Sequence, residues 1–402
     1  MTASLYIHIP FCAGLCDYCD FFSVSVDAVN DSDLMDSFIG AVLGDVEDQL
    51  AIFGVGHVPT VYIGGGTPSV LGASRMERLL AGLQALLVPI GWPPAEFTVE
   101  ANPESAAADF LRACRDGGVS RISLGVQTFH EPSRQAVRRK GGCNLLEERL
   151  ALAAELFPGR LSADLITGLP FQTISVLEND IDTLMSYKPA HVSLYSLAIE
   201  PETPLGRQAA KTGAAALSLP DGDEADNLWL AGRDMLKKAD LSQYEVSNFA
   251  LPEKYCAHNI RYWQMENWLG AGPAASGTLI GGRARDGGAA GRRMTYAADT
   301  GAYLAAPRPR IDAARTEELS RADLIRESLL MGFRCLGGPD EGLFRRRFSC
   351  GIEDCIPATI ERWRGRGFFD VKNPDGLAPC EQGLLFLNSF LRDAFGELAT
   401  TH

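Results

Sequence analysis

The stretch Tyr6-Ile-His-Ile-Pro-Phe-Cys12-Ala-Gly-Leu-Cys16-Asp-Tyr-Cys19 places three cysteines within eight residues, directly after a predicted strand. Three thiolates so close together can hold one face of a cubic [4Fe–4S] cluster and leave the fourth iron without a protein ligand. An open position on a metal centre is where exogenous chemistry takes place. The spacing therefore predicts an iron–sulfur cluster on Cys12, Cys16 and Cys19.

Zinc and unligated thiols are the competing interpretations of this motif. Structural zinc normally has four Cys or His ligands, and Cys114, Cys143 or His8 could supply the fourth. The spacing favours the cluster but leaves both alternatives open.

An alternation of β-rich runs with amphipathic stretches continues outward from the cysteines through the first two hundred residues. Leucines and methionine recur at helical spacing over 76–87, and apolar residues do so over 174–184. Six strand–helix units predict a parallel α/β sheet, and six are too few for a closed eight-stranded barrel. We therefore expect an open, partial (β/α)6 barrel. The predicted strands are Leu5–Ile9, Thr60–Ile63, Glu96–Glu100, Arg121–Val126, Leu161–Ile166 and His191–Ile199.

The second half of the chain has a different pattern. Polar and loop-forming residues at 201–223 and a Gly/Arg-rich stretch at 281–292 predict loops, with a helix over 223–239 between them. From about residue 316 the pattern becomes helix, helix and a short β-like end. We expect two domains, residues 1–300 with the barrel and its extension, and residues 310–402 as a small helical, winged-helix-like unit.

Charge and composition restrict the partners. A formal net charge of −14 disfavours nucleic acid and anionic lipid, because either favours a basic surface. The sequence shows neither a signal-like amino terminus nor a run of about 18 apolar residues that could span a membrane. Ten cysteines without a secretion signal favour a reducing compartment. We expect a cytoplasmic protein that is not an integral membrane protein, with peripheral contact at the inner face of the membrane left open.

Further motifs follow the cysteines in a fixed order. Together they resemble the radical S-adenosylmethionine (SAM) group that contains the oxygen-independent coproporphyrinogen III oxidases and the related haem chaperones. The resemblance covers nearly the whole chain and implies a [4Fe–4S] cluster with SAM at its open iron. The motifs are Tyr62-Ile-Gly-Gly-Gly-Thr-Pro68, Val99-Glu-Ala-Asn-Pro103, Arg121-Ile-Ser-Leu-Gly-Val-Gln127-Thr-Phe, Ala163-Asp164-Leu-Ile-Thr-Gly-Leu-Pro170 and His258-Asn259-Ile-Arg-Tyr262-Trp263.

The resemblance also implies which residues line the SAM pocket. Several stand at or near the carboxyl ends of predicted strands, where the sites of α/β barrels assemble. Each also has an ordinary alternative: a glycine can simply form a tight turn, a carboxylate can cap a helix, and an apolar side chain can belong to the core. The polar set is Tyr6, Gly65, Gly66, Thr67, Glu100, Gln127, Arg139 and Asp164, and the apolar walls are Ile166 and Ala198.

His258 is a separate candidate, because imidazole is a common iron ligand in haem proteins and the resemblance includes haem chaperones. The stretch around His258 is therefore a candidate tetrapyrrole site. The alternative is a hydrogen-bonded histidine packed under Trp263 and Trp268.

Two features place the chain nearer the chaperone branch than the oxidase branch. The oxidases carry a fourth cysteine two residues after the third, where this chain has Phe21. They also have an amino-terminal extension, whereas eleven residues precede Cys12 here. Two departures count the other way, since Ser276 and Gly141 stand where chaperone-type sequences usually have histidines.

Three functions follow from these observations. The first is a haem chaperone, which binds haem near His258 and passes it to a recipient haem protein, with an electron donor for the cluster. The second is an oxidase, which decarboxylates two propionates of coproporphyrinogen III to vinyl groups. The third is a structural metal protein without radical chemistry. The resemblance favours the first, which uses the cluster and SAM for control or transfer rather than for decarboxylation.

Overall fold

The computed structural model describes residues 1–26, 32–281, 290–372 and 376–401. Its main sheet has twelve strands. The strand order is β14-β13-β12-β11-β1-β4-β5-β6-β7-β8-β10-β9. A separate two-stranded sheet pairs β2 with β3. The strands are β1 (Ser4–Ile9), β2 (Phe11–Cys12), β3 (Val24–Ser25), β4 (Thr60–Gly65), β5 (Glu96–Ala101), β6 (Arg121–Gln127), β7 (Leu161–Thr167), β8 (His191–Ser196), β9 (Ser242–Gln243), β10 (Asn248–Ala250), β11 (Trp268–Ala271), β12 (Ser276–Ile280), β13 (Gly291–Thr295) and β14 (Arg315–Leu319).

The predicted open α/β barrel is confirmed. Strands β1, β4, β5, β6, β7 and β8 are neighbours in the sheet and pair in parallel throughout. The sheet ends at β9 on one side and at β14 on the other, so it does not close. Strand β8 stops at Ser196, three residues before the predicted end.

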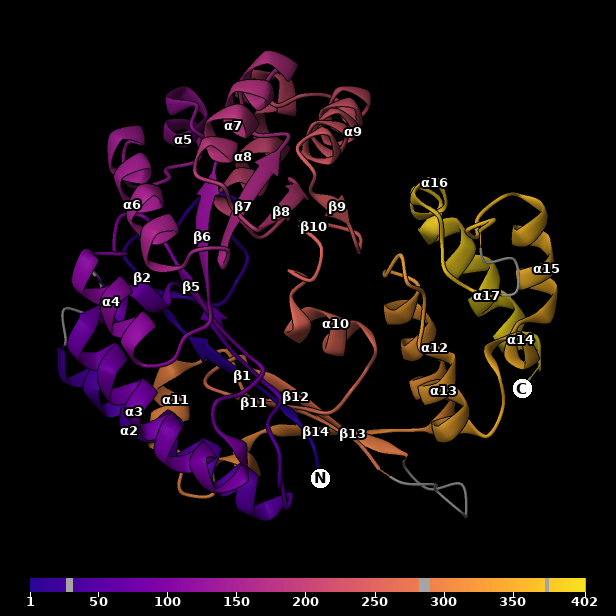
Figure 1. Cartoon of the computed structure of the whole chain (residues 1–402), viewed down its shortest axis with the longest axis horizontal. Helices are drawn as coiled ribbons and strands as arrows, with labels where there is room; N and C mark the ends of the chain where they lie inside the picture. Colours follow the sequence, from indigo (N-terminus) through magenta and orange to yellow (C-terminus); the bar gives the residue numbers. More distant parts are fainter. Residues whose placement is uncertain (27–31, 282–289, 373–375, 402) are drawn as a thin grey trace.

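The two faces of this parallel core differ in chemistry. Because side chains alternate along a strand, Ile7, Ile63 and Leu124 share one face, and all three are fully buried. Helices cover that face on the outside of the curved sheet (Figure 1). The opposite, inner face carries polar and aromatic side chains, such as Tyr62 and Glu100, that are only partly buried. The covering helices are α2 (Ser32–Ile52), α3 (Gly72–Gly91), α4 (Ala108–Asp116), α5 (Glu131–Ala136), α6 (Cys143–Leu156), α7 (Ile174–Ser186) and α9 (Gly222–Lys238).

Residues 201–223 are not a plain loop as predicted, because they contain the helix α8 (Pro204–Thr212) and a short 3-10 turn at Ala214–Leu217. The Thr203 hydroxyl accepts a hydrogen bond from the Gly206 amide at 3.1 Å and so caps α8. Pro204 at the first helical position needs no donor partner, which suits a helix start. Capping chemistry therefore overrides the loop-like composition.

Helix α10 (Ala257–Trp263) and strands β11 to β14 extend the barrel beyond the predicted helix of residues 223–239, and the sequence analysis did not predict them. Strand β11 pairs in parallel with β1, and β12, β13 and β14 follow as an antiparallel ribbon. Residues 282–289 of the predicted Gly/Arg turn lie outside the described residues. Gly291, at the end of that stretch, already belongs to β13.

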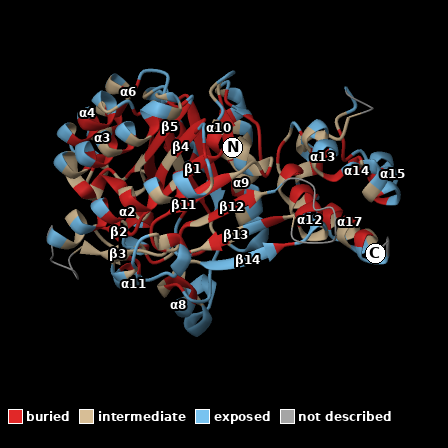
Figure 2. Cartoon of the chain, turned by 90° about the horizontal axis from the view of Figure 1, so that it is seen from below, coloured by how far each residue is buried: buried red, intermediate tan, exposed pale blue. Residues whose placement is uncertain are grey.

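The carboxyl-terminal region is helical and lies beside the open side of the barrel, with α10 between them (Figure 1). Its aromatic core includes Phe333, Phe368 and Phe390, whose rings contact one another. The same core includes Met265 and Trp268 of the barrel extension, so the two parts share buried apolar surface (Figure 2). The helices are α12 (Arg321–Gly332), α13 (Glu341–Phe348), α14 (Ile352–Cys355), α15 (Pro357–Gly365), α16 (Glu381–Leu384) and α17 (Leu387–Thr401).

The predicted boundary at residue 310 and the predicted β-like end differ in detail from the structure. Strand β14 still pairs with β13 of the sheet, and the helices begin only at Arg321. Within the described part of the carboxyl-terminal region, β structure consists of two isolated bridges, one between Phe369 and Pro379 and one that joins Cys335 to Glu245 of the barrel extension.

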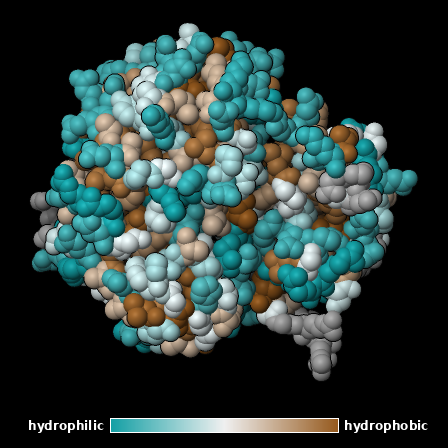
Figure 3. Space-filling view, in the orientation of Figure 1, coloured by the Kyte–Doolittle hydropathy of each residue, from teal (hydrophilic) through white to brown (hydrophobic). Residues whose placement is uncertain are grey.

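The helices of the described ranges include none that is long and apolar enough to cross a membrane. Hydrophilic residues are mixed with smaller hydrophobic areas over the face shown in Figure 3.

Candidate functional site

The cysteine loop follows β1 and lies at the carboxyl ends of the parallel strands, the edge of the sheet where sites of α/β barrels assemble. Backbone hydrogen bonds fix it from two sides. The Asp17 amide donates to the Val137 carbonyl at 3.0 Å, and the Leu205 amide donates to the Asp17 carbonyl at 2.9 Å. The Asp17 carboxylate also pairs with Arg138. The loop is therefore anchored to the segment after α5 and to α8.

A continuous hydrogen-bonded path joins two of the three cysteines through the ends of neighbouring strands. Cys12 Sγ lies 3.4 Å from Thr67 Oγ1, which accepts from Asn102 Nδ2 at 2.9 Å. Asn102 Oδ1 accepts from Arg139 Nη2 at 2.7 Å, and Arg139 Nη1 lies 3.6 Å from Cys16 Sγ. Thr67 and Arg139 were predicted for the site. Asn102 was not, although it stands in the quoted motif directly after β5.

The electrostatics of this path suit a metal cluster. Burial raises the pKa of Cys12, and it raises the pKa of Cys19 to about 11. Burial also lowers the pKa of Arg139, but Tyr18 and Cys16 outweigh it, so the pKa ends above its ordinary value. The guanidinium therefore stays charged, while the thiols of Cys12 and Cys19 are protonated in the metal-free chain. Cationic iron makes such thiols ionise on binding.

The described residues contain no group of three His, Cys, Asp or Glu side chains gathered as the ligands of a single ion are. Cys12 is buried, whereas Cys16 and Cys19 are half-buried.

The glycines at the end of β4 allow the cysteine loop to approach the sheet. A Cβ on Gly66 would lie 2.7 Å from the Phe11 carbonyl and 3.2 Å from Cys12 Sγ. Gly65 has a φ of +108°, and its Cβ would lie 2.6 Å from the His8 ring. Gly65 and Gly66 thus serve close packing of β1 and the cysteine loop against the turn.

Two predicted carboxylates lie on the inner face. The Tyr62 hydroxyl donates to Glu100 at 2.6 Å, and the Gly65 amide donates to Glu100 at 3.2 Å. The Ser123 hydroxyl lies 3.4 Å from Asp164. Desolvation by burial raises the pKa of Glu100 to about 7 and that of Asp164 to about 6. A bound cation would favour their ionised forms.

Gln127 ends β6 at an irregularity in the pairing with β7, and it has a φ of +68°. A left-handed conformation at a glutamine requires support from its surroundings. That support comes from Arg134, which sequence reasoning missed.

Arg134 is 1% exposed and joins the two backbone segments that carry Gln127 and Arg139. Its Nη1 donates to the carbonyls on either side of Gln127, those of Val126 and Thr128, at 2.9 Å each. Its Nε and Nη2 donate to the carbonyls that follow Arg139, at distances of 2.8 to 3.2 Å. A lone arginine gives no sequence signal for this role.

The remaining predicted pocket residues occupy different surroundings. Tyr6 is half-buried, and its hydroxyl lies 3.1 Å from His8 Nδ1. Ile166 is 7% exposed in a small apolar cluster to which Tyr18 of the cysteine loop also belongs. Ala198 is exposed and follows the end of β8. The structure thus brings Ile166 close to the cysteine loop and leaves Ala198 at the surface.

His258 lies at the opposite, amino-terminal end of the strands. Its Nδ1 is 2.9 Å from the hydroxyl of Thr60, the first residue of β4, and its amide donates to Glu96, the first residue of β5. It is 7% exposed, and burial lowers its pKa to about 4. Five residues of strand, about 16 Å, separate this level from the glycine turn. Burial and hydrogen bonding are what the alternative interpretation of His258, a packed and hydrogen-bonded histidine, predicts. Its ring packs against Tyr62, with 5.2 Å between the ring centroids, and not against the tryptophans that this interpretation named.

The two positions that lack the usual histidines have local explanations. Gly141 has a φ of +77°, and its carbonyl accepts from Arg134. Ser276 lies 3.0 Å from the Thr295 hydroxyl.

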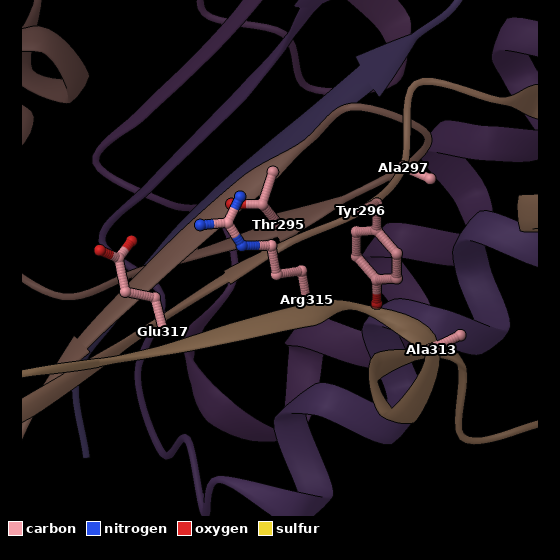
Figure 4. A pocket seen from close by; sticks show the side chains of 6 residues that line it. All are labelled: Thr295, Tyr296, Ala297, Ala313, Arg315 and Glu317. Carbon is pink, nitrogen blue, oxygen red and sulfur yellow. The ribbon is translucent and has the colours of Figure 1, made fainter.

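Thr295 borders a cavity of about 420 Å³ at the far edge of the sheet (Figure 4). The cavity is lined by Thr295, Tyr296, Ala297, Ala313, Arg315 and Glu317.

The donor set fits a thiolate-bound cluster with SAM. Arg139 Nε is buried without a hydrogen-bond partner among the described residues, so this guanidinium can still donate to a carboxylate. Glu100 and Asp164, both half-buried on the inner face, offer acceptors for a cationic ligand. Cys12, Cys16 and Cys19 would hold the cluster. When bound, cluster and SAM together supply one-electron reductive cleavage of a carbon–sulfur bond.

Comparisons with known proteins agree with this geometry. The model of the radical SAM superfamily matches residues 6–184. Haem chaperone HemW of Lactococcus lactis subsp. lactis (strain IL1403) is 34% identical over 87% of this chain and 86% of its own length. Haem chaperone HemW of Escherichia coli (strain K12) is 32% identical over 96% of this chain and 97% of its own.

A solved structure, that of coproporphyrinogen III oxidase (HemN) from Escherichia coli, described as a radical SAM enzyme, has a similar fold. Its TM-score is 0.80 at 22% identity, over 98% of this chain and 90% of that chain. Fold and site therefore define a radical SAM protein with a [4Fe–4S] cluster and SAM as cofactors. Within that class, the chain belongs to the HemW family.

Proposed function

We propose that this radical SAM protein binds haem and transfers it to a recipient haem protein. The observation that carries the proposal is the similarity over nearly the whole chain to proteins named haem chaperone, at 32% and 34% identity. The named oxidase has the same fold, but at 22% identity that likeness extends to the fold alone.

Exposed apolar side chains around the cysteine loop support the proposal. Phe21, two residues after Cys19, is 72% exposed, and Leu15 of the same loop is also exposed. Phe171 and Tyr195 are exposed near the ends of β7 and β8, on the same edge of the sheet. Exposed apolar residues that gather at one edge are typical of a site for an apolar ligand. A flat macrocycle such as haem has the apolar surface to cover them.

His258 remains a candidate iron ligand within this proposal. Its ring lies beneath Tyr62 and is bonded through Nδ1, so ligation would use Nε2. A second hypothesis follows from the exposed edge, namely that haem binds beside the cysteine loop without His258.

Haem titration of the anaerobically reconstituted protein tests both. We expect Phe171→Ser to weaken haem binding, and Val88→Ser, an equally exposed apolar residue of the outer helix α3, to leave it unchanged. Loss of binding in His258→Ala, with an unchanged unfolding midpoint, would assign the iron ligand. Unchanged affinity and stoichiometry in that variant would remove His258 from the proposal. Absence of haem binding in the wild type would refute the chaperone function.

The same preparation tests the oxidase. With SAM and coproporphyrinogen III, protoporphyrinogen above the level of a Cys16→Ser control would identify decarboxylation and overturn our proposal. 5′-Deoxyadenosine without porphyrinogen conversion would support the chaperone.

We place this function in the cytoplasm, at the inner face of a membrane when the recipient is a membrane protein. All ten cysteines are free thiols in the structure, which suits a reducing compartment. The cluster needs an electron donor there. The recipient is identified by crosslinking haem-loaded protein to its partners.

A further inference from the structure

A pair of cysteines in the carboxyl-terminal helices takes no part in the site described above. Cys350 follows the end of α13, and Cys355 is the last residue of α14. Their Sγ atoms are 3.6 Å apart, and both residues are half-buried. The sulfurs are thus in contact and reachable from solvent, which distinguishes them from the buried Cys114, Cys256 and Cys335.

The backbone between the two cysteines brings them together. Ser349 has a φ of +56° and ends α13 in a left-handed turn. The Gly351 amide donates to Asp354 at 2.7 Å, which starts α14 at once. A disulfide has sulfurs about 2.05 Å apart. The sulfurs therefore have to move closer by about 1.5 Å, a shift that side-chain rotation can supply.

The two thiols have unlike surroundings. Arg321 Nη2 donates to the Phe348 carbonyl at 2.8 Å and lies 3.4 Å from Cys350 Sγ, so a cation faces that sulfur. Burial, and then the neighbouring Cys350, raise the pKa of Cys355 to about 12. The raised pKa keeps the Cys355 thiol protonated, and the Arg321 guanidinium beside Cys350 can balance the negative charge of an attacking sulfur. Cys350 is therefore suited to attack and Cys355 to resolve.

We propose that Cys350 and Cys355 are a covalent modification site, which low-molecular-weight disulfides convert to an intramolecular disulfide. The Cys350 thiolate attacks one sulfur of the oxidant, the oxidant's S–S bond breaks, and one thiolate leaves. Cys355 then gives up its proton to solvent and attacks Cys350 Sγ, and the second thiol leaves. Two protein thiols are oxidised, and one disulfide is reduced to two thiols. The product ties the end of α13 to α14.

Mass spectrometry tests the proposal directly, because both cysteines fall on one tryptic peptide, residues 348–362. The full-length, cluster-loaded protein is incubated anaerobically with glutathione disulfide, and free thiols are then alkylated. We expect this peptide to carry no alkyl groups and to be lighter than the reduced, unalkylated peptide by two hydrogen atoms. Dithiothreitol should restore two alkylatable thiols. Doubly alkylated peptide in the oxidised sample would overturn the proposal.

Variants test the order of the two steps. Cys355→Ser should accumulate a glutathione adduct on Cys350, because the resolving thiol is missing. Cys350→Ser should leave Cys355 largely free of adduct. Cys380→Ser changes another half-buried cysteine and should leave disulfide formation unchanged. Equal adduct on Cys350 and Cys355 in the two single variants would refute the assigned roles. Cluster absorbance, followed in parallel, separates this oxidation from damage at Cys12, Cys16 and Cys19.

Discussion

Replacing Arg134 by methionine is expected to destabilise the two backbone segments that carry Gln127 and Arg139 of the candidate SAM site. The variant keeps an unbranched apolar stem but removes the guanidinium that donates to the carbonyls of Val126, Thr128, Lys140 and Gly141. Each buried carbonyl left without a donor costs about 1–3 kcal/mol, so the four carbonyls together could lower the free energy of unfolding by at most about 4–12 kcal/mol. Relief of the buried charge returns several kcal/mol. We expect a net loss of about 3–5 kcal/mol in the free energy of unfolding.

Urea unfolding of the cluster-free protein measures this loss, and SAM titration of the reconstituted protein measures its effect on the site. SAM affinity should fall roughly tenfold or more, because small displacements of binding groups have large effects. Arg326→Met is the control, since Arg326 of α12 is exposed and makes a surface pair with Asp323 that is worth about 0–1 kcal/mol. If Arg134→Met unfolds within about 1 kcal/mol of that control, water satisfies the carbonyls and our reasoning is wrong.

Three further predictions concern the site and its support. Because burial raises the pKa of Glu100 to about 7, the carboxyl group becomes charged as the pH rises through that value. Affinity for cationic SAM should therefore increase about tenfold from about pH 6 to about pH 8. Calorimetry that finds the same dependence of SAM affinity on pH in Glu100→Gln would contradict this. Gly66→Ala should reduce the iron content and destabilise the chain by about 1–3 kcal/mol, because the added Cβ meets the Phe11 carbonyl. A variant with the iron content and the melting temperature of the wild type would exclude the clash. Glu96→Gln should destabilise the protein by about 3 kcal/mol in denaturant unfolding, because the buried Arg121 loses its ionic partner; an unchanged midpoint would show that the pair contributes little.

The sequence predicts the parallel core well because its signals are local. Apolar strands and amphipathic helices alternate, and the three cysteines directly follow the first strand. The antiparallel ribbon from β11 to β14 was not predicted because its strands have four or five residues, and those of β12 to β14 have mixed polarity. The helix α8 escaped because its capping threonine and proline stand in a stretch of loop-like composition.

The candidate site was predictable where side chains stand at strand ends, as Thr67 and Glu100 do. Contacts between distant segments were not predictable. Asn102 and Arg134 act through partners in other elements, and neither residue type nor spacing reveals those partners. His258 illustrates the opposite case, in which a motif is visible in the sequence but the structure places it at the other end of the strands.

The path from Cys12 through Thr67 and Asn102 to Arg139 and Cys16 has a consequence for the life of the newly made chain. Cys12 and Thr67 are 55 residues apart in sequence, and Cys16 and Arg139 are 123 residues apart. Thr67 and Asn102 follow the ends of β4 and β5, and Arg139 follows α5. During synthesis the three cysteines leave the ribosome first, yet their surroundings are complete only after Arg139 has emerged and β6 has joined the sheet. Contacts of such sequence separation form slowly. Insertion of the cluster is therefore tied to the maturation of the barrel, and an early-loaded, half-made chain would hold its iron without the arginine that faces Cys16.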